Sequence, residues 1–195
     1  KAIVEGANLY LTPGARYALE KLTVIIIKDS SCNKGGVICS SLEVLANLCM
    51  SEQEFLSHKS HYIEEVLQTI KKAALHEARL ILRTHQQTGA WFTDISEKIS
   101  EKINLFKYQI LDHLSTILLS SDPKDPFIRC LIHYCPPLLR THYLQAILNL
   151  PDIHKKAIIA CHIASQLVYK KGLEWNPSIS DILPLIAQDP ELFED

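Results

Sequence analysis

The first fifty residues follow the order strand, helix, strand, glycine loop and helix, and this order constrains the fold more than any other feature. An apolar run at residues 2–4 precedes a helix that begins at Thr12 and Pro13, which suit the N-cap and the first helical position. The β-branched run at residues 24–27 is typical of a strand buried on both faces of a parallel sheet. Since two strands alone do not make a stable parallel sheet, we expect further strands upstream of this sequence.

From residue 51 onward the apolar residues recur at helical spacing, and we predict helices throughout. Ser51 with Glu54, and Asp94 with Glu97, have the spacing of capping boxes and predict two helix starts, while Gly89 predicts the end of the first helix. The second helix is expected to reach about residue 120. Shorter helices are expected at residues 126–135, 137–150, 152–171 and 180–188.

Two asparagine- and glycine-containing motifs follow the two predicted strands. One is Glu5-Gly6-Ala7-Asn8, and the other is Asn33-Lys34-Gly35-Gly36-Val37, which follows a polar loop at residues 28–34 and continues to Ser40. Ligands of doubly wound sheets bind at the carboxyl ends of the strands, and an asparagine amide can bond to a carboxamide or a ribose hydroxyl. A glycine pair lets the backbone approach a ligand at a helix N-terminus. The alternative is that the glycines only turn the chain and each asparagine caps a turn.

These patterns predict a mixed fold class. Residues 1–50 are interpreted as the closing βαβα part of a dinucleotide-binding (Rossmann-like) α/β domain. Residues 51–195 are interpreted as an all-α C-terminal domain, with the boundary near residues 51–60.

The motif residues from Glu5 to Asn8, the helix start at Thr12, and the segment from Asn33 to Val37 together resemble the glutamate dehydrogenase family. Lys34 and the run at residues 40–46 make the segment similar to the large NAD-specific members. The resemblance is specific over residues 1–50 and looser to about residue 105. Beyond that point the interpretation rests on helical periodicity alone.

The resemblance implies NAD-dependent, reversible oxidative deamination of L-glutamate to 2-oxoglutarate and ammonia. It implies cofactor contacts for Asn8, on the nicotinamide-side ribose or the nicotinamide, and for Asn33, on the carboxamide. It also implies a close backbone approach at Gly35 and Gly36.

For the substrate, the resemblance implies a pocket for the glutamate side chain lined by Val37 and Ser40, with Ser40 bonding to the distal carboxylate. Cys32 and the pair Ile38-Cys39 depart from the residues more usual in the family.

The family's catalytic lysine and aspartate, and its glycine-rich phosphate motif, have no counterpart in these 195 residues. We therefore expect no catalytic residue in this chain, which would be inactive alone while the parent protein is an enzyme. The alternative is a stand-alone or remnant helical module that interacts or regulates without catalysis.

Composition limits the partners. With 20 basic and 22 acidic residues, nothing suggests binding to nucleic acid or to an anionic membrane through bulk charge, and no apolar run is long enough to cross a membrane. Six scattered cysteines are typical of reduced thiols and a cytoplasmic protein. We expect a homo-oligomer formed through the parent protein.

Two further groups of residues contain side chains that can bind ligands. A metal site at Cys130, His133 and Cys135 is disfavoured, because a proline breaks the helix there and zinc requires a fourth ligand. The doublet Lys170-Lys171 is interpreted as complementing the dipole at a helix end rather than as a phosphate site.

Overall fold

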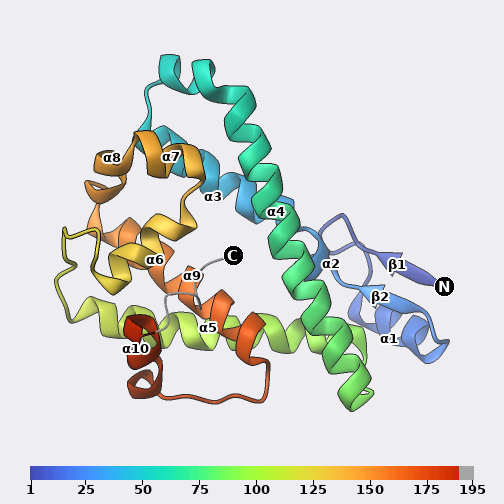
Figure 1. The fold of residues 1–195 in the computed structure, drawn as a ribbon. Helices are drawn as coiled ribbons and strands as arrows, with labels where there is room; N and C mark the ends of the chain where they lie inside the picture. The colour runs from blue at the N-terminus through green and yellow to red at the C-terminus, as the bar shows by residue number, and fades with distance from the viewer. Residues whose placement is uncertain (189–195) are drawn as a thin grey trace.

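The computed structural model describes residues 1–188, and this part of the chain is mostly helical with one small parallel sheet (Figure 1). The strands are β1 (Ala2–Val4) and β2 (Ile25–Ile27). The helices are α1 (Pro13–Lys21), α2 (Asp29–Cys32), α3 (Lys34–Cys49), α4 (Glu52–Thr88), α5 (Phe92–Ser115), α6 (Pro126–Tyr134), α7 (Pro137–His142), α8 (Leu144–Leu148), α9 (Asp152–Lys171) and α10 (Ile179–Gln188).

The two strands pair in parallel, with Ala2 opposite Ile25 and Val4 opposite Ile27. The predicted parallel pairing is therefore confirmed. The prediction that the second strand is buried on both faces is wrong for the described chain, because Ile26 is fully buried while Ile25 is 41% exposed. Helices α1 and α5 contact β2, and in residues 1–188 no comparable cover lies over Ile25.

The predicted polar loop at residues 28–34 contains a short helix, α2. Its first residue, Asp29, accepts a hydrogen bond from the backbone N–H of Ser30 at 2.7 Å, which favours a turn at this point. Asn33 then ends α2 and caps α3. Local hydrogen bonds thus order the segment between the second strand and the glycine pair. Its polar composition alone predicts a loop and gives no sign of these bonds.

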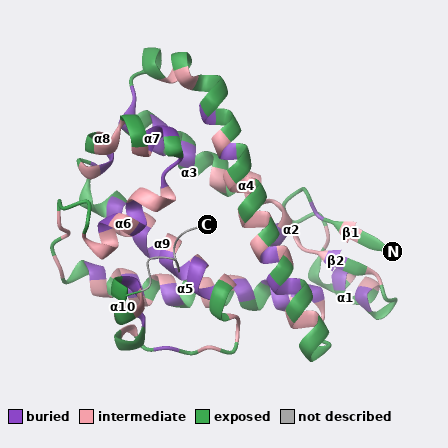
Figure 2. Ribbon diagram, viewed as in Figure 1, coloured by how far each residue is buried: buried purple, intermediate pink, exposed green. Residues whose placement is uncertain are grey.

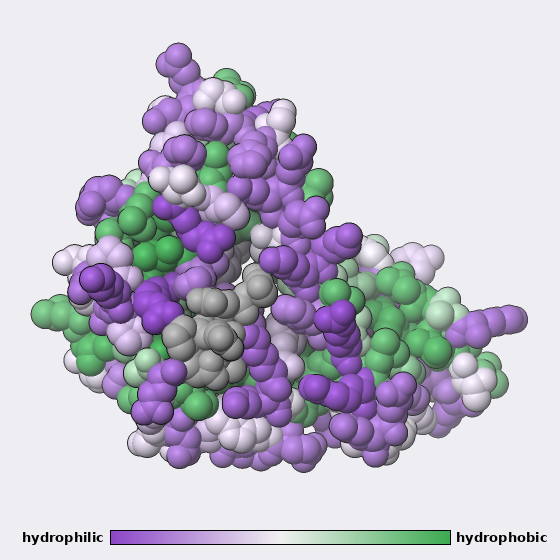
Figure 3. Space-filling model, viewed as in Figure 1, coloured by the Kyte–Doolittle hydropathy of each residue, from purple (hydrophilic) through white to green (hydrophobic). Residues whose placement is uncertain are grey.

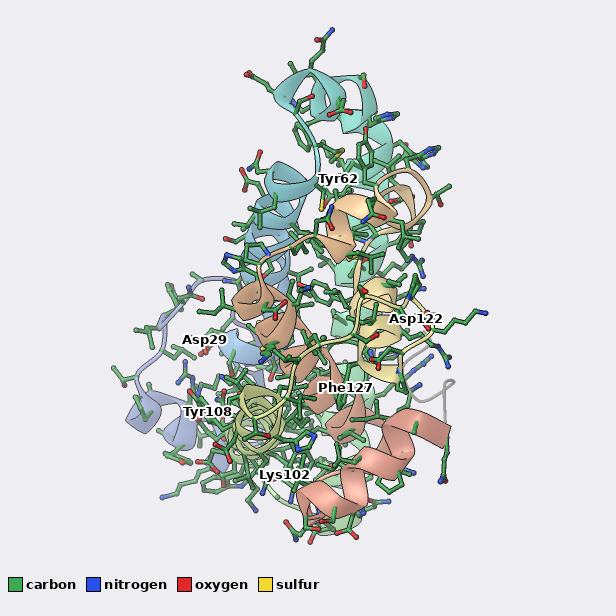
Figure 4. The ribbon with its side chains drawn as sticks, turned by 90° about the vertical axis from the view of Figure 1, so that its left-hand side faces the viewer. Asp29, Tyr62, Lys102, Tyr108, Asp122 and Phe127 are labelled. Carbon is green, nitrogen blue, oxygen red and sulfur yellow. The ribbon has the colours of Figure 1, made fainter. Side chains whose placement is uncertain are left out.

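The long helix α4 runs from one end of the described molecule to the other (Figure 1). Its start follows the predicted capping box, since Ser51 and Glu54 each accept from the other's backbone N–H. Its end follows Gly89, whose φ of +69° suits glycine. Near the start of α4, the hydroxyl of Tyr62 donates to the backbone carbonyl of Leu42 at 2.6 Å and ties α4 to α3 (Figure 4).

Helix α5 begins earlier than predicted. Its N-cap is Trp91, which makes no side-chain cap bond, and the box predicted at Asp94 and Glu97 is not the helix start. The backbone N–H of Thr93 instead donates to the carboxylate of Glu20, on α1, at 3.1 Å. A side chain distant in sequence caps this helix, which a local motif search cannot find. The helix also ends at Ser115 rather than near residue 120.

The core lies where the helices meet (Figure 2). Helices α5 and α9 make the most extensive contact, α4, α6 and α10 pack against this pair, and α3 packs against α4. The single helix predicted at residues 137–150 is two short ones, because Tyr143, with a φ of −127°, interrupts it. The core is continuous from Leu42 to Ile186, and the domain boundary near residue 50 stays a prediction. Within residues 1–188, no helix is both long and apolar enough to span a bilayer.

Candidate functional site

The two motif asparagines meet at one edge of the sheet. Asn33 Nδ2 donates to Asn8 Oδ1 at 2.9 Å. Asn8 lies in the loop after β1, and Asn33 lies between α2 and α3 after β2. Because the two strands are parallel, the segments that leave their carboxyl ends lie on the same side of the sheet. Both residues are predicted from the sequence as cofactor contacts, and the structure brings their side chains together.

Asn33 also caps α3, since its Oδ1 accepts from the backbone N–H of Gly36 at 3.3 Å. The capping role raised as an alternative is therefore present at Asn33, alongside the contact with Asn8. Gly35 and Gly36 form part of the first turn of α3 with ordinary helical φ values. A Cβ built on Gly35 would meet no atom within 4 Å, so the backbone is open to approach there.

Val37 and Ser40 lie on the first two turns of α3, one helical turn apart. Val37 is 73% exposed and Ser40 is also exposed. They point away from the residues of α3 that enter the core, which begin at Leu42. No described residue covers them, so any pocket that they line must be completed by atoms outside residues 1–188.

Beneath the asparagines lies a buried charged cluster, Glu5, Arg16 and Asp29. Arg16 Nη2 lies 2.7 Å from Glu5 Oε2 and 3.6 Å from Asp29 Oδ1. Glu5 Oε2 also accepts from the backbone N–H of Asp29 at 3.1 Å. All three residues are buried, so their charged groups are hydrogen-bonded within the protein rather than by water.

This cluster also holds the loop that carries Asn8. Leu9 has a φ of +54°, which is unfavourable for a branched side chain. Its backbone N–H donates to Asp29 Oδ2 at 2.7 Å, and this bond offsets part of the strain. The cluster thereby fixes the position of Asn8 relative to Asn33.

The environment of the cluster shifts two pKa values. Burial alone would raise the pKa of Asp29, but the backbone N–H groups of Leu9 and Ser30 and the charge of Arg16 together bring it below its ordinary value. The hydrogen bond from Arg16 to Glu5 raises the pKa of Arg16 against the opposing effect of burial. Asp29 and Arg16 are therefore both charged at neutral pH.

A second contact joins the glycine segment to the helical region, and sequence reasoning missed it. Lys34, directly before Gly35, forms an ion pair with Glu77 of α4, which is 1% exposed. The hydroxyl of Tyr169, on α9, donates to Glu77 Oε2 at 2.7 Å. One sequence signal could have predicted this contact. Glu77 occupies a position of α4 that helical spacing places on the same face as Ile70 and Ile81, where an apolar residue is expected.

The surface beside the strands is apolar. Figure 3 shows hydrophobic residues gathered over the part of the molecule that holds β1, β2 and α1. Exposed apolar side chains there include Val4, Leu9, Tyr10, Leu22 and Ile25. A contiguous apolar surface of this kind marks a place where another part of a protein packs.

No group of three or more metal-binding side chains occurs among residues 1–188. Cys130 and Cys135 are buried, and burial raises the pKa of both thiols, that of Cys130 to about 12. Thiols in such surroundings stay protonated at neutral pH and are poor metal ligands. All six cysteines are free.

A parallel strand pair whose trailing loops bring together two asparagines is the arrangement expected at the ligand-binding edge of a dinucleotide-binding sheet. The chain belongs to the Glutamate/Leucine/Phenylalanine/Valine dehydrogenase family, whose sequence model matches residues 1–98.

The similarity to individual relatives extends further along the chain than the family match does. It is 36% identical to glutamate dehydrogenase 2 of Dictyostelium discoideum over 89% of this chain, and 36% identical to the NAD-specific glutamate dehydrogenase of Neurospora crassa over 87%. It is 33% identical to the NAD-specific glutamate dehydrogenase of Saccharomyces cerevisiae over 89%. These alignments extend past residue 105, into helices that the sequence analysis assigned from periodicity alone. The chain spans 17–18% of the length of these curated relatives. No solved structure matches it.

Proposed function

We propose that this chain is one part of an NAD-dependent glutamate dehydrogenase, which interconverts L-glutamate and 2-oxoglutarate with release of ammonia. The observation that carries the proposal is the contact between Asn8 and Asn33, at the carboxyl edge of a parallel strand pair, in a chain of this dehydrogenase family. The names of the relatives support both the substrate and NAD.

The residues present fit a nicotinamide cofactor. Within residues 1–188 the amide nitrogen of Asn8 has no hydrogen-bond partner, so it is available to donate to a ribose hydroxyl or a carboxamide oxygen. Asn33 retains one amide hydrogen after bonding to Asn8, and the backbone at Gly35 is open to approach by the ring. The backbone at Gly36 lies against the Asn33 side chain, since a Cβ there would meet Asn33 Oδ1 at 3.4 Å. NAD, when bound, would accept the hydride removed from glutamate.

For the substrate, we assign a hydrogen bond from the Ser40 hydroxyl to the distal carboxylate and a packing contact from Val37. Both lie on the face of α3 that no described residue covers. Residues 1–50 would close a Rossmann-like domain whose other strands cover the apolar surface beside β1 and β2. The catalytic lysine and aspartate and the phosphate-binding glycine motif would come from elsewhere in a longer protein.

The helical domain, residues 51–195, would stiffen the nucleotide-binding domain or join copies of the protein. Its ion pair with Lys34 supports the first role. The exposed apolar residues Leu56, Ile63 and Leu67, which recur at helical spacing along one side of α4, support a homo-oligomeric contact.

The test is glutamate-dependent reduction of NAD, followed by the absorbance of the reduced cofactor. We expect no turnover by the purified 195-residue chain and turnover by a longer protein that contains it. Turnover by the chain alone would contradict the assignment of a partial site. Inactivity of both would favour the alternative, a helical interaction module without catalysis.

In the longer protein, Asn33→Ala is expected to raise the KM for NAD by roughly tenfold, because one hydrogen bond to the cofactor is lost. Asn47→Ala, at an exposed position on the same helix, is the matched control and should leave the KM unchanged. An equal effect of both substitutions would show that α3 is sensitive to any change and would remove the specific role of Asn33.

A further inference from the structure

A pocket on the helical region gathers basic side chains that the proposed function does not use. It lies between the last three turns of α4 and the segment that ends α9, and its volume is about 320 Å³. Arg83 lines it from α4, and Lys170 and Lys171 line it from α9. A smaller hollow of about 140 Å³ adjoins it, shares Arg83 and Lys170, and adds Arg79.

The positions of the two arginines place their charge in one stripe. Arg79 and Arg83 are four residues apart on α4, so they lie on the same face one turn apart. Arg83 also reaches across to the other wall, since its Nη2 would lie 3.9 Å from a Cβ built on Gly172. Like charges at this spacing repel slightly, and an anion placed between the two side chains would relieve that repulsion.

The described chain supplies little negative charge to balance them. Among residues 1–188, no ion pair joins Arg79, Arg83 or Lys171 to a carboxylate. Glu174 is the acidic residue among the described lining residues. Glu77, nearby on α4, is buried and already bound to Lys34 and Tyr169. Arg79, Arg83 and Lys171 therefore give the described walls of the two hollows a positive excess.

Helix dipoles explain only part of this excess. Lys170 and Lys171 occupy the last turn of α9, where a positive charge complements the helix C-terminus, as the sequence analysis interpreted them. Arg83 and Arg79 lie more than one turn before the end of α4 at Thr88, beyond the range of that effect. The dipole of α4 therefore does not account for two arginines beside a hollow.

We propose that this pocket binds a small phosphate-bearing molecule. Arginine side chains bond to phosphate through two parallel N–H groups, and lysine adds a mobile point charge. The volume exceeds that of a single phosphate group and falls at the lower end of the range for small-ligand pockets. Thr84 and Gln87 on α4 supply neutral hydrogen-bonding groups for the rest of the ligand. The site is separate from Asn8 and Asn33 and does not depend on the proposed dehydrogenase function.

The experiment is a titration of the ¹⁵N-labelled 195-residue chain with pyrophosphate, monitored by amide chemical shifts at low ionic strength. We expect saturable shifts in α4 near Arg83 and at the end of α9, with a dissociation constant below about 1 mM. Succinate, which carries two carboxylates, should bind at least tenfold more weakly. Saturable shifts confined to residues near Asn33, or no saturation at all, would overturn the proposal.

Arg83→Gln and, separately, Lys171→Gln should each weaken pyrophosphate binding by roughly tenfold, since a charged hydrogen bond is lost. Both positions are exposed, so the fold should tolerate the changes, and far-ultraviolet circular dichroism checks this. The matched control is Lys59→Gln, which removes one charge from the same helix roughly 36 Å from Arg83. Equal weakening by the control, or equal affinity for succinate, would show a non-specific charge effect and overturn the site.

Discussion

At the scale of single residues, the candidate site depends on buried charge. Arg16 lies between Glu5 and Asp29, and Asp29 in turn holds the strained backbone of Leu9. Removal of one member would leave a buried partner without compensation, which costs more than the loss of an exposed ion pair. The geometry at Asn8 is therefore sensitive to residues that would not themselves touch a ligand.

Asp29→Asn tests this dependence through pH. The folded-state pKa of Asp29 lies below its ordinary value of 3.8, so the carboxylate stabilises the fold at neutral pH, and this contribution is lost as the pH falls below about 4. We expect Asp29→Asn to lower the free energy of unfolding by about 1–3 kcal/mol at pH 7. The difference from wild type should shrink on acidification, as measured by urea unfolding across a pH series.

Asp112→Asn, at an exposed position on α5, is the control and should change the stability by less than about 0.5 kcal/mol at any pH. A deficit for Asp29→Asn that did not shrink between pH 7 and pH 3 would contradict a stabilising role for the ionised carboxylate.

At the scale of the elements, local sequence determines some helix ends and distant side chains determine others. Ser51 and Glu54 begin α4 by bonding to each other, and Gly89 ends it through a left-handed backbone conformation. The start of α5 is different, because Glu20 of α1 caps Thr93. The first two positions can therefore be predicted from local spacing, whereas the predicted start of α5 is wrong because its cap is a tertiary contact.

Gly89→Ala is expected to destabilise the protein by roughly 1–2 kcal/mol, because an L side chain is strained at a φ of +69°. Gly14→Ala is the matched control. Gly14 lies in α1, and a Cβ built there meets no atom within 4 Å, so alanine should be neutral or stabilise by up to about 1 kcal/mol. Thermal and chemical unfolding of both variants give the comparison, and equal effects would refute the backbone argument.

At the scale of the whole molecule, α9 contacts the glycine segment through one buried carboxylate. Tyr169 on α9 donates to Glu77 on α4, and Glu77 pairs with Lys34 at the start of α3. Residues of three helices that are distant in sequence therefore meet directly beside Gly35. This contact links the region that matches the family to the helices that follow it.

Tyr169→Phe removes one donor to Glu77 and keeps the ring. We expect a loss of about 1–3 kcal/mol in the free energy of unfolding, and faster amide hydrogen exchange at Gly35 and Gly36. Tyr108→Phe, at an exposed position on α5, should change neither quantity. Unchanged exchange at the two glycines in Tyr169→Phe would show that the contact does not order the candidate site.

Much of the candidate site could be predicted because its signals are local. The order of strands and helices placed Asn8 and Asn33 after two parallel strands, and pairing of those strands brings the two side chains within hydrogen-bonding distance. The buried cluster of Glu5, Arg16 and Asp29 could not be found in this way. Its members lie 11 to 24 residues apart, and their pairing depends on the packing of α1 against β2.

The sequence by itself determined the helix starts with local caps, the parallel strand pair, the motif asparagines and glycines, and the likeness to glutamate dehydrogenases. Each depends on spacing along the chain or on the backbone preferences of single residues. The tertiary structure alone decided that Glu77 joins Lys34 to Tyr169, that Glu20 caps α5, and that Arg83 and Lys171 line one pocket. Those contacts arise only when distant helices pack, because charge and burial are properties of the assembled core rather than of any segment.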